Sequence, residues 1–145
     1  MTAAVFLAFD YGDKYLGIAV GSRHSGQAEA LTTLRGSGKN PDWVRISRLL
    51  EEWKPDALVV GLPLNMDGST NSMTRAARAF GHRLQDRYNL PVHMVDERLT
   101  TLAARDILNE AGVSMRQHGA KLDQLAAQTI LQAFLNDLPR DANHD

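Results

Sequence analysis

Short apolar runs alternate along the chain with longer stretches in which apolar residues recur at helical spacing. Residues 4–10 and 16–20 are apolar runs joined by a Gly/Asp turn, which predicts a β-hairpin whose first strand is buried on both faces. A weaker third strand is expected over 29–34. The runs at 57–61 and 92–95 each follow a helical stretch, so we expect both strands to lie parallel to the first.

Four stretches have the apolar periodicity of helices. The first is expected to begin with Asn40 as its cap and Pro41 in its first turn, and to end at Lys54. The other three are expected over about 70–88, 100–111 and 121–137, with a loop at 112–120 before the last. This order of elements predicts an α/β fold with a mixed five-stranded sheet flanked by helices.

Length and composition narrow the class of protein. The chain has 145 residues, 43% of them hydrophobic, which suits one domain over 1–138 followed by a polar tail over 139–145. It has no cysteine, which excludes a disulfide scaffold and a thiolate zinc site. Without an apolar run of roughly 20 residues or a basic N-terminal start, we expect a soluble, cytoplasmic protein with no membrane partner. The net charge of −1 argues against binding of nucleic acid through the overall charge of the protein.

Acidic residues stand where the predicted strands end. Asp10 closes the first strand, and Asp96 and Glu97 close the last. Because the carboxyl ends of parallel strands meet at one edge of a sheet, these acids are expected to lie close together. For any one of them, the alternative is a helix cap or a solvated turn residue.

Asp123 lies in the last expected helix, at the border of the apolar stripe that contains Ile130. A carboxylate buried there is costly unless it is paired or binds a metal ion. The alternatives are therefore a salt bridge to Arg98, Arg105 or Lys121, or a three-acid metal site. Oxygen ligands without cysteine favour Mg²⁺ or Mn²⁺, and two such ions would serve phosphodiester hydrolysis.

Four segments resemble the motifs of a known family. They are FDYGDKYLGIAVG (9–21), VVGLPLNMDGS (59–69), DERLTT (96–101) and KLD (121–123). In this order they resemble the YqgF family, also called RuvX-like, whose members are described as Holliday junction resolvases or pre-16S rRNA nucleases. The resemblance implies a ribonuclease H-like fold.

The resemblance also implies roles for single residues. It makes Asp10, Glu97 and Asp123 the catalytic acids and the metal ligands, and it places Arg98 and the segment 61–69 in the same cleft. Many relatives carry Arg where this chain has Tyr15, so if that Arg touches substrate, either Lys14 substitutes for it or the contact is lost.

A nuclease of this kind must hold a phosphate backbone beside its metal ions. Arg75 and Arg78 share the polar arc of one helix, and the loop over 61–70 is expected to meet phosphate with its backbone amides. The alternatives are a solvated helix face and an ordinary turn capped by Ser69 or Thr70. The expected substrate-binding residues are Lys14, Asn65, Arg75, Arg78, Arg98, Arg116 and Lys121. Both tryptophans, at helical spacing with apolar residues, are expected in the core.

The acidic residues and the resemblance together predict a metal-dependent nuclease, acting as a monomer or homodimer with Mg²⁺ or Mn²⁺. The resemblance implies that it processes the 5′ end of pre-16S rRNA in ribosome biogenesis. One alternative is a resolvase of branched DNA at Holliday junctions. Another is a non-catalytic nucleic-acid-binding module in ribosome assembly or transcription. A nucleotide-binding domain of the sugar-kinase or actin type is disfavoured, because the chain is too short for two copies and has no second Asp-x-Gly hairpin.

Overall fold

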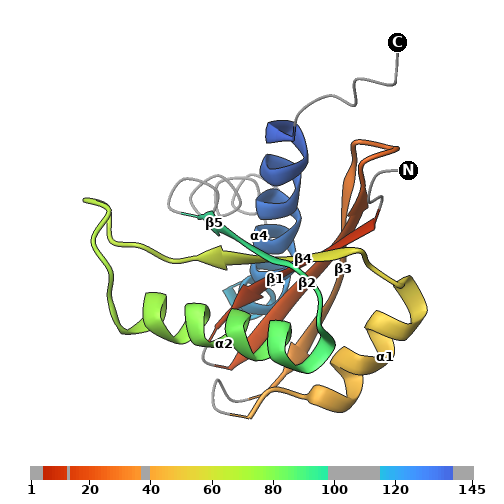
Figure 1. Ribbon diagram of the computed structural model, residues 1–145. Helices are drawn as coiled ribbons and strands as arrows, with labels where there is room; N and C mark the ends of the chain where they lie inside the picture. Colours follow the sequence, from red (N-terminus) through yellow and green to blue (C-terminus); the bar gives the residue numbers. More distant parts are fainter. Residues whose placement is uncertain (1–4, 13, 37–39, 98–114, 139–145) are drawn as a thin grey trace.

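The computed structural model describes residues 5–12, 14–36, 40–97 and 115–138, and of residues 115–123 only the backbone (Figure 1). The strands are β1 (Val5–Tyr11), β2 (Tyr15–Ser22), β3 (Ala28–Arg35), β4 (Ala57–Leu62) and β5 (Val92–Asp96). They form one sheet in the order β3-β2-β1-β4-β5. The first three strands are antiparallel, whereas β4 runs parallel to β1 and β5 parallel to β4. This confirms the mixed five-stranded sheet.

The described helices are α1 (Trp43–Trp53), α2 (Ser72–Tyr88) and α4 (Met115–Asp137). The helix expected over 100–111 and the polar tail lie outside the described residues. Within the described ranges, no helix has the length and apolar character needed to cross a membrane.

The helix starts differ from the sequence prediction because other residues supply the caps. Asp42 caps α1 by accepting a hydrogen bond from the backbone three residues on, so the assignment of Asn40 as cap was wrong. Asn71 caps α2 in the same way, in place of Ser69 or Thr70. Asn, Asp, Ser and Thr are all good caps, so adjacent candidates cannot be ranked without the backbone path.

The start of α4 corrects a second expectation. Residues 115–120 were expected to belong to a loop, but they form the first turns of α4. Gly119 lies within these turns, and a single glycine costs a helix only about 1 kcal/mol. The helix therefore begins before the apolar stripe from which it was predicted.

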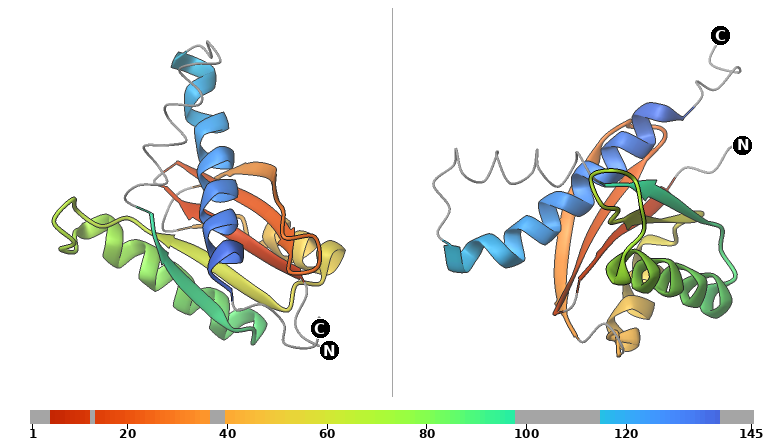
Figure 2. Two further views of the ribbon diagram at one scale, coloured as in Figure 1. Left: turned by 90° about the horizontal axis from the view of Figure 1, so that it is seen from above. Right: turned by 90° about the vertical axis from the view of Figure 1, so that its left-hand side faces the viewer.

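The sheet is the middle of three layers (Figure 2). Its α1/α2 face carries Leu7, Phe9, Ile18, Leu58 and Val60 under α1 and α2. Its α4 face carries Phe6, Ala8, Ala19, Ala57 and Val59 under α4. Trp43 and Trp53 pack against the core of the α1/α2 face, which confirms their prediction as core residues.

Two glutamines attach α4 to the edge of the sheet. Gln132 accepts a hydrogen bond from the Ala28 amide at 3.0 Å and donates one to the carbonyl of Gly26 at 2.9 Å. Gln128 donates to the carbonyl of Ala28 at 3.0 Å. These bonds fix the position of α4 along β3, and with it the position of every residue on the helix.

Candidate functional site

Asp10 and Glu97 come to the same edge of the sheet, where the parallel strands β1, β4 and β5 end. The β1–β4 register pairs Phe9 with Val60, so Asp10 lies one position further along that edge. Glu97 follows β5 directly, and its amide donates a hydrogen bond at 3.2 Å to the carbonyl of Leu62, the last residue of β4. This register agrees with the prediction that Asp10 and Glu97 lie at the same edge of the sheet.

Both acids belong to the α4 face. Side chains alternate along a strand, and Ala8 packs on the α4 face, so Asp10 points to that face too. Glu97 is only 6% exposed, and a Cβ atom added to Gly61 would collide with Glu97 Oε2 and with Cδ1 of Ile130 in α4. The carboxylate of Glu97 is thus enclosed between β4 and α4.

Glycines border these carboxylates on both sides. Gly17 of β2 pairs with Asp10, and Gly61 of β4 lies one position beyond the last β1–β4 pair. A larger residue at Gly61 would fill the space that Glu97 occupies. Two carboxylates on one face and at one edge of the sheet fit the hard oxygen coordination of Mg²⁺ or Mn²⁺.

Asp123 lies on α4, with its side chain outside the described residues. The Phe134 ring packs on Phe6 near the start of β1 with centroids 5.2 Å apart, whereas Ile130 lies near the end of β4. Towards its N-terminus α4 therefore runs to the carboxyl edge, and Asp123 precedes Ile130 by about 10 Å of helix. Among the described side chains, no group of three acidic, His or Cys residues could hold a metal ion, so the triad stays a prediction.

Asp96 is separated from Glu97 by the pleat of β5. Met94 packs against the core of the α1/α2 face, and alternation places Asp96 on that same side, where it is exposed. The two neighbouring acids of the DERLTT motif thus belong to opposite faces of the sheet.

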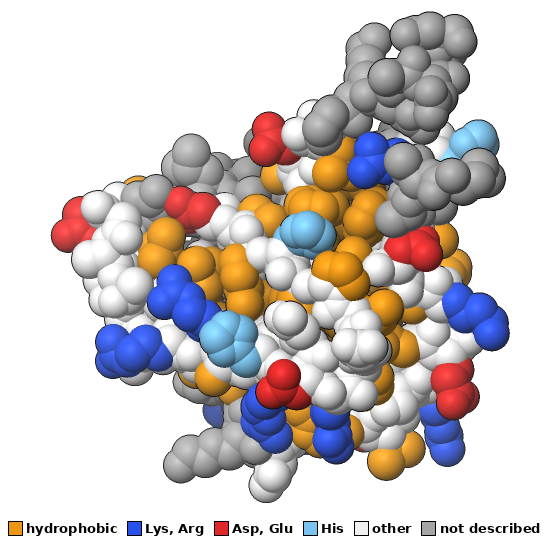
Figure 3. Space-filling model, in the orientation of Figure 1, with side chains coloured by type: hydrophobic (Ala, Val, Ile, Leu, Met, Phe, Trp, Pro, Cys, Tyr) orange, Lys and Arg blue, Asp and Glu red, His pale blue; other side chains and the backbone are white. Residues whose placement is uncertain are grey.

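The predicted cationic contacts fall into three groups. Lys14 is exposed in the turn between β1 and β2, at the same edge as Asp10. Arg75 and Arg78 are exposed on α2, where basic side chains are visible in Figure 3, on the other side of the sheet. Arg116 and Lys121 lie on α4 with side chains outside the described residues, and Arg98 lies outside them altogether.

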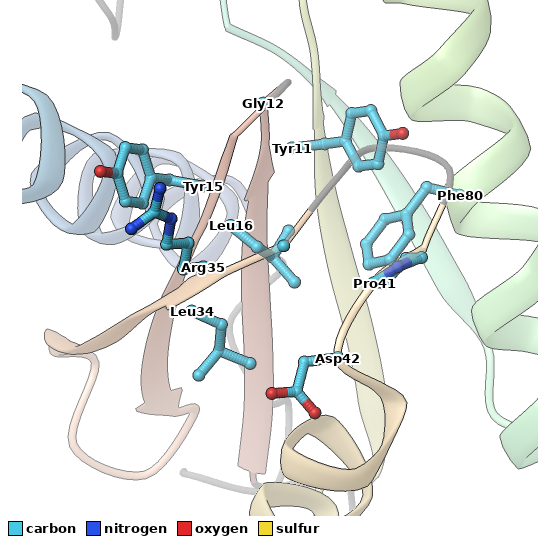
Figure 4. A pocket seen from close by; sticks show the side chains of 10 residues that line it. Tyr11, Gly12, Tyr15, Leu16, Leu34, Arg35, Pro41, Asp42 and Phe80 are labelled. Atoms are coloured by element: carbon cyan, nitrogen blue, oxygen red, sulfur yellow. The ribbon is translucent and has the colours of Figure 1, made fainter.

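Arg35 was not among the predicted contacts; it is exposed and pairs with Tyr15 across β2 and β3. Figure 4 shows the two side chains next to each other. Leu16 packs in the α1/α2 face, so Tyr15 and its partner Arg35 lie on the α4 face with Asp10. The predicted strand ended at residue 34, and only the strand register brings this arginine beside Tyr15.

The pocket in Figure 4 is lined by Tyr15 and Arg35 together with Leu16, Leu34 and Phe80. Its volume is about 10 Å³, which is room for one water molecule at most. We interpret it as a packing gap and not as a ligand site.

Asn65 uses its side chain within its own loop. Its Nδ2 donates to Ser69 Oγ at 2.9 Å, and its Oδ1 accepts from Asn71 Nδ2 at 2.8 Å. The side chain of Asn65 thus helps to hold the loop together, and its contact with substrate stays a prediction.

Comparison with known proteins agrees with this architecture. A family model described as RuvX, Holliday junction resolvase, matches residues 4–137. A relative from Nitrosococcus oceani is 51% identical over 134 residues, covering 92% of this chain and 87% of the relative. One from Pseudomonas putida is 46% identical over 132 residues, covering 90% and 94%. Both carry the name "Putative pre-16S rRNA nuclease".

Solved structures share the fold at low sequence identity. The fowlpox virus resolvase in complex with Holliday junction DNA superposes with a TM-score of 0.59 at 10% identity, covering 94% of this chain and 99% of that one. Thermus thermophilus RuvC in complex with a Holliday junction substrate gives 0.51 at 17% identity, covering 92% and 94%. These likenesses confirm the expected ribonuclease H-like fold.

Proposed function

Because the chain belongs to the RuvX family and is a nuclease, we propose that it hydrolyses phosphodiester bonds of structured RNA and processes the 5′ end of pre-16S rRNA. The substrate class follows from the name carried by relatives at 46–51% identity. The observation that supports the site is the location of Asp10 and Glu97 on one face and one edge of the sheet, bordered by Gly17 and Gly61.

Asp10, Glu97 and Asp123 are the proposed ligands of Mg²⁺ or Mn²⁺. Two such ions supply activation of the attacking water and neutralise charge on the leaving oxygen. The enclosure of Glu97 by Gly61 and Ile130 restricts its carboxylate to few positions, so its oxygens are oriented before substrate arrives. The acids bind metal only when ionised, so activity depends on divalent metal and is lost at acidic pH.

The cations at the same edge are the proposed contacts of the scissile strand. Lys14 is exposed in the turn between β1 and β2, and Arg35 is exposed at the end of β3, so both lie at the sheet edge that carries Asp10. An arginine holds a phosphate through paired N–H donors, which fixes the orientation of the backbone as well as its charge. Arg75 and Arg78 on α2 are proposed to hold more distant phosphates of the same substrate.

The test is cleavage of a 5′-extended pre-16S rRNA by the full chain with Mg²⁺ or Mn²⁺. Asp10→Asn and Glu97→Gln are each expected to lower the rate by at least about 100-fold, because each removes an ionised ligand. Asp96→Asn is the matched control, since it changes an adjacent acid on the opposite face, and it should keep the rate within about twofold. Activity that survives Asp10→Asn contradicts the metal site.

A second candidate is resolution of Holliday junctions, which the description of the matching family favours. Four-way junction DNA in the same assay distinguishes the two, because the preferred substrate is the one with the larger kcat/KM. Symmetric cutting of a junction needs two active sites, so light scattering should find a homodimer if junctions are the substrate. Binding of RNA and DNA without cleavage of either would favour the non-catalytic module.

A further inference from the structure

The loop between β4 and α2, residues 63–71, is held in one conformation by its own polar groups. The amide of Asn65 donates to the carbonyl of Ser69 at 2.9 Å, and the amide of Gly68 donates to the carbonyl of Asn65 at 2.8 Å. Ser69 donates to Asp67 Oδ1 from both its amide and its hydroxyl, at 2.9 Å and 2.6 Å. Gly68 has a φ of 90°, which requires glycine at this point of the turn.

The ends of the loop are also tied down. Asn71 and Thr74 exchange hydrogen bonds in a capping box at the start of α2, and the Thr74 hydroxyl donates to the carbonyl of Pro63. Thr74 is fully buried. The loop is thus anchored both to α2 and to the end of β4, and its tip is presented in a fixed orientation.

These bonds occupy several of the backbone amides that were predicted to meet phosphate. A phosphate-binding loop presents unused amides to its ligand. Here the amides of Asn65, Gly68, Ser69 and Asn71 donate to acceptors within the loop or its cap. Asp67 adds a carboxylate near the tip, which repels phosphate.

An apolar side chain occupies the tip. Met66 is 70% exposed, and among the described residues only Val44 on α1 is a comparably exposed large apolar side chain, at 65%. The loop begins right after Leu62, whose carbonyl accepts from the Glu97 amide, and it projects beyond the end of β4 (Figure 1). A rigid apolar tip therefore stands beside the edge that carries the candidate metal ligands.

We propose that Met66 is a wedge that packs against a base unstacked at a branch point or strand end of the nucleic-acid substrate. Thioethers pack well on aromatic faces, and every base has such a face. The contact therefore recognises an interruption in the stacking of bases, whatever the base sequence. The proposal rests on the proposed function and names how that site selects structured substrates.

The experiment measures binding with Ca²⁺ in place of Mg²⁺, which separates it from cleavage. The probes are a forked RNA duplex with 2-aminopurine at the branch and a continuous duplex of the same length. Met66→Gln is expected to lower the preference for the fork about 5-fold and to abolish the fluorescence change at the branch. Met66→Leu should keep both, and so should Val44→Gln, the matched control on α1.

The outcomes separate this inference from the function on which it rests. The wedge is overturned if Met66→Gln and Val44→Gln show the same preference for the fork and the same fluorescence change. It is also overturned if Met66→Gln lowers the affinity for the forked and the continuous duplex equally. In either case Asp10-dependent cleavage by the unmodified chain leaves the proposed function standing. If the unmodified chain neither binds nor cleaves the fork or pre-16S rRNA, the proposed function fails and the wedge fails with it.

Discussion

The two faces of the sheet are built from residues of different size. The α1/α2 face carries Phe9, Leu58 and Val60, and the ring of Phe80 packs there at 5.8 Å from Phe9 and 5.9 Å from Trp43. The α4 face instead carries a set of small residues, which are Ala8, Ala19, Ala28, Ala57 and Gly61. The predicted catalytic acids that the structure describes are all on this second face.

This difference assigns separate tasks to the two faces. Large buried side chains remove the most apolar surface from water and so contribute most of the stability. Small side chains contribute less, but they let α4 approach the sheet and leave volume for carboxylates. Because neighbours along a strand face opposite ways, Phe9 and Asp10 serve these two tasks at adjacent positions. Three substitutions test the division.

The largest effect is expected on the α1/α2 face. Phe80→Ala empties the centre of the aromatic cluster with Phe9, Tyr11 and Trp43, and should lower the free energy of unfolding by about 3–5 kcal/mol. Urea denaturation measures this loss. The rate per folded molecule should stay unchanged, because the cluster lies across the sheet from Asp10. A Phe80→Ala protein that keeps its stability but cleaves slowly would contradict the assignment of stability to the α1/α2 face and of catalysis to the α4 face.

A pair of glycines gives the next largest effect. Gly61→Ala places a methyl group against Glu97 and Ile130, and should cost about 1–3 kcal/mol of stability together with most of the activity. Gly81→Ala places one against the flexible end of Met94 on the α1/α2 face. Since alanine favours the helix by about 0.5–1 kcal/mol over glycine, Gly81→Ala should be nearly neutral. Thermal denaturation and the cleavage assay, run on both variants, should separate them; equal losses of activity would refute the special role of Gly61.

The smallest effect concerns the attachment of α4. Gln132→Ala removes two hydrogen bonds to the β3 edge and leaves the Ala28 amide without its side-chain acceptor, which should cost about 1–2 kcal/mol. Hydrogen exchange at Ala28 should accelerate. Gln85→Ala, at an exposed position of α2, is the control and should change stability by less than about 0.5 kcal/mol. Equal exchange rates at Ala28 in both variants would show that the hydrogen bonds of Gln132 do not hold α4 in place.

The sheet was predictable from the sequence because its strands are short apolar runs separated by turn residues and helices. The edge at which Asp10 and Glu97 meet followed from strand direction, which the connections between elements determine. Helix caps were less predictable, since Asn40 and Asp42 are chemically suited to the same role.

Contacts between distant segments could not be predicted, because they depend on register and on the path of each loop. Arg35 is next to Tyr15 only through the pairing of β2 with β3. The hydrogen bonds of the Asn65 amide group to Ser69 and Asn71 likewise depend on the path of the loop. Propensity and periodicity describe each element by itself and contain no information on such partners.

The pleat between Asp96 and Glu97 has a consequence for how this chain can change in evolution. Deleting one residue from β5 would turn its remaining side chains over, and Asp96 in place of Glu97 would face α4. Asp96 would then stand at the position of Val95, two positions short of the one from which Glu97 reaches Gly61 and Ile130. Substitutions can accumulate along this strand, whereas insertions and deletions of a single residue should be selected against.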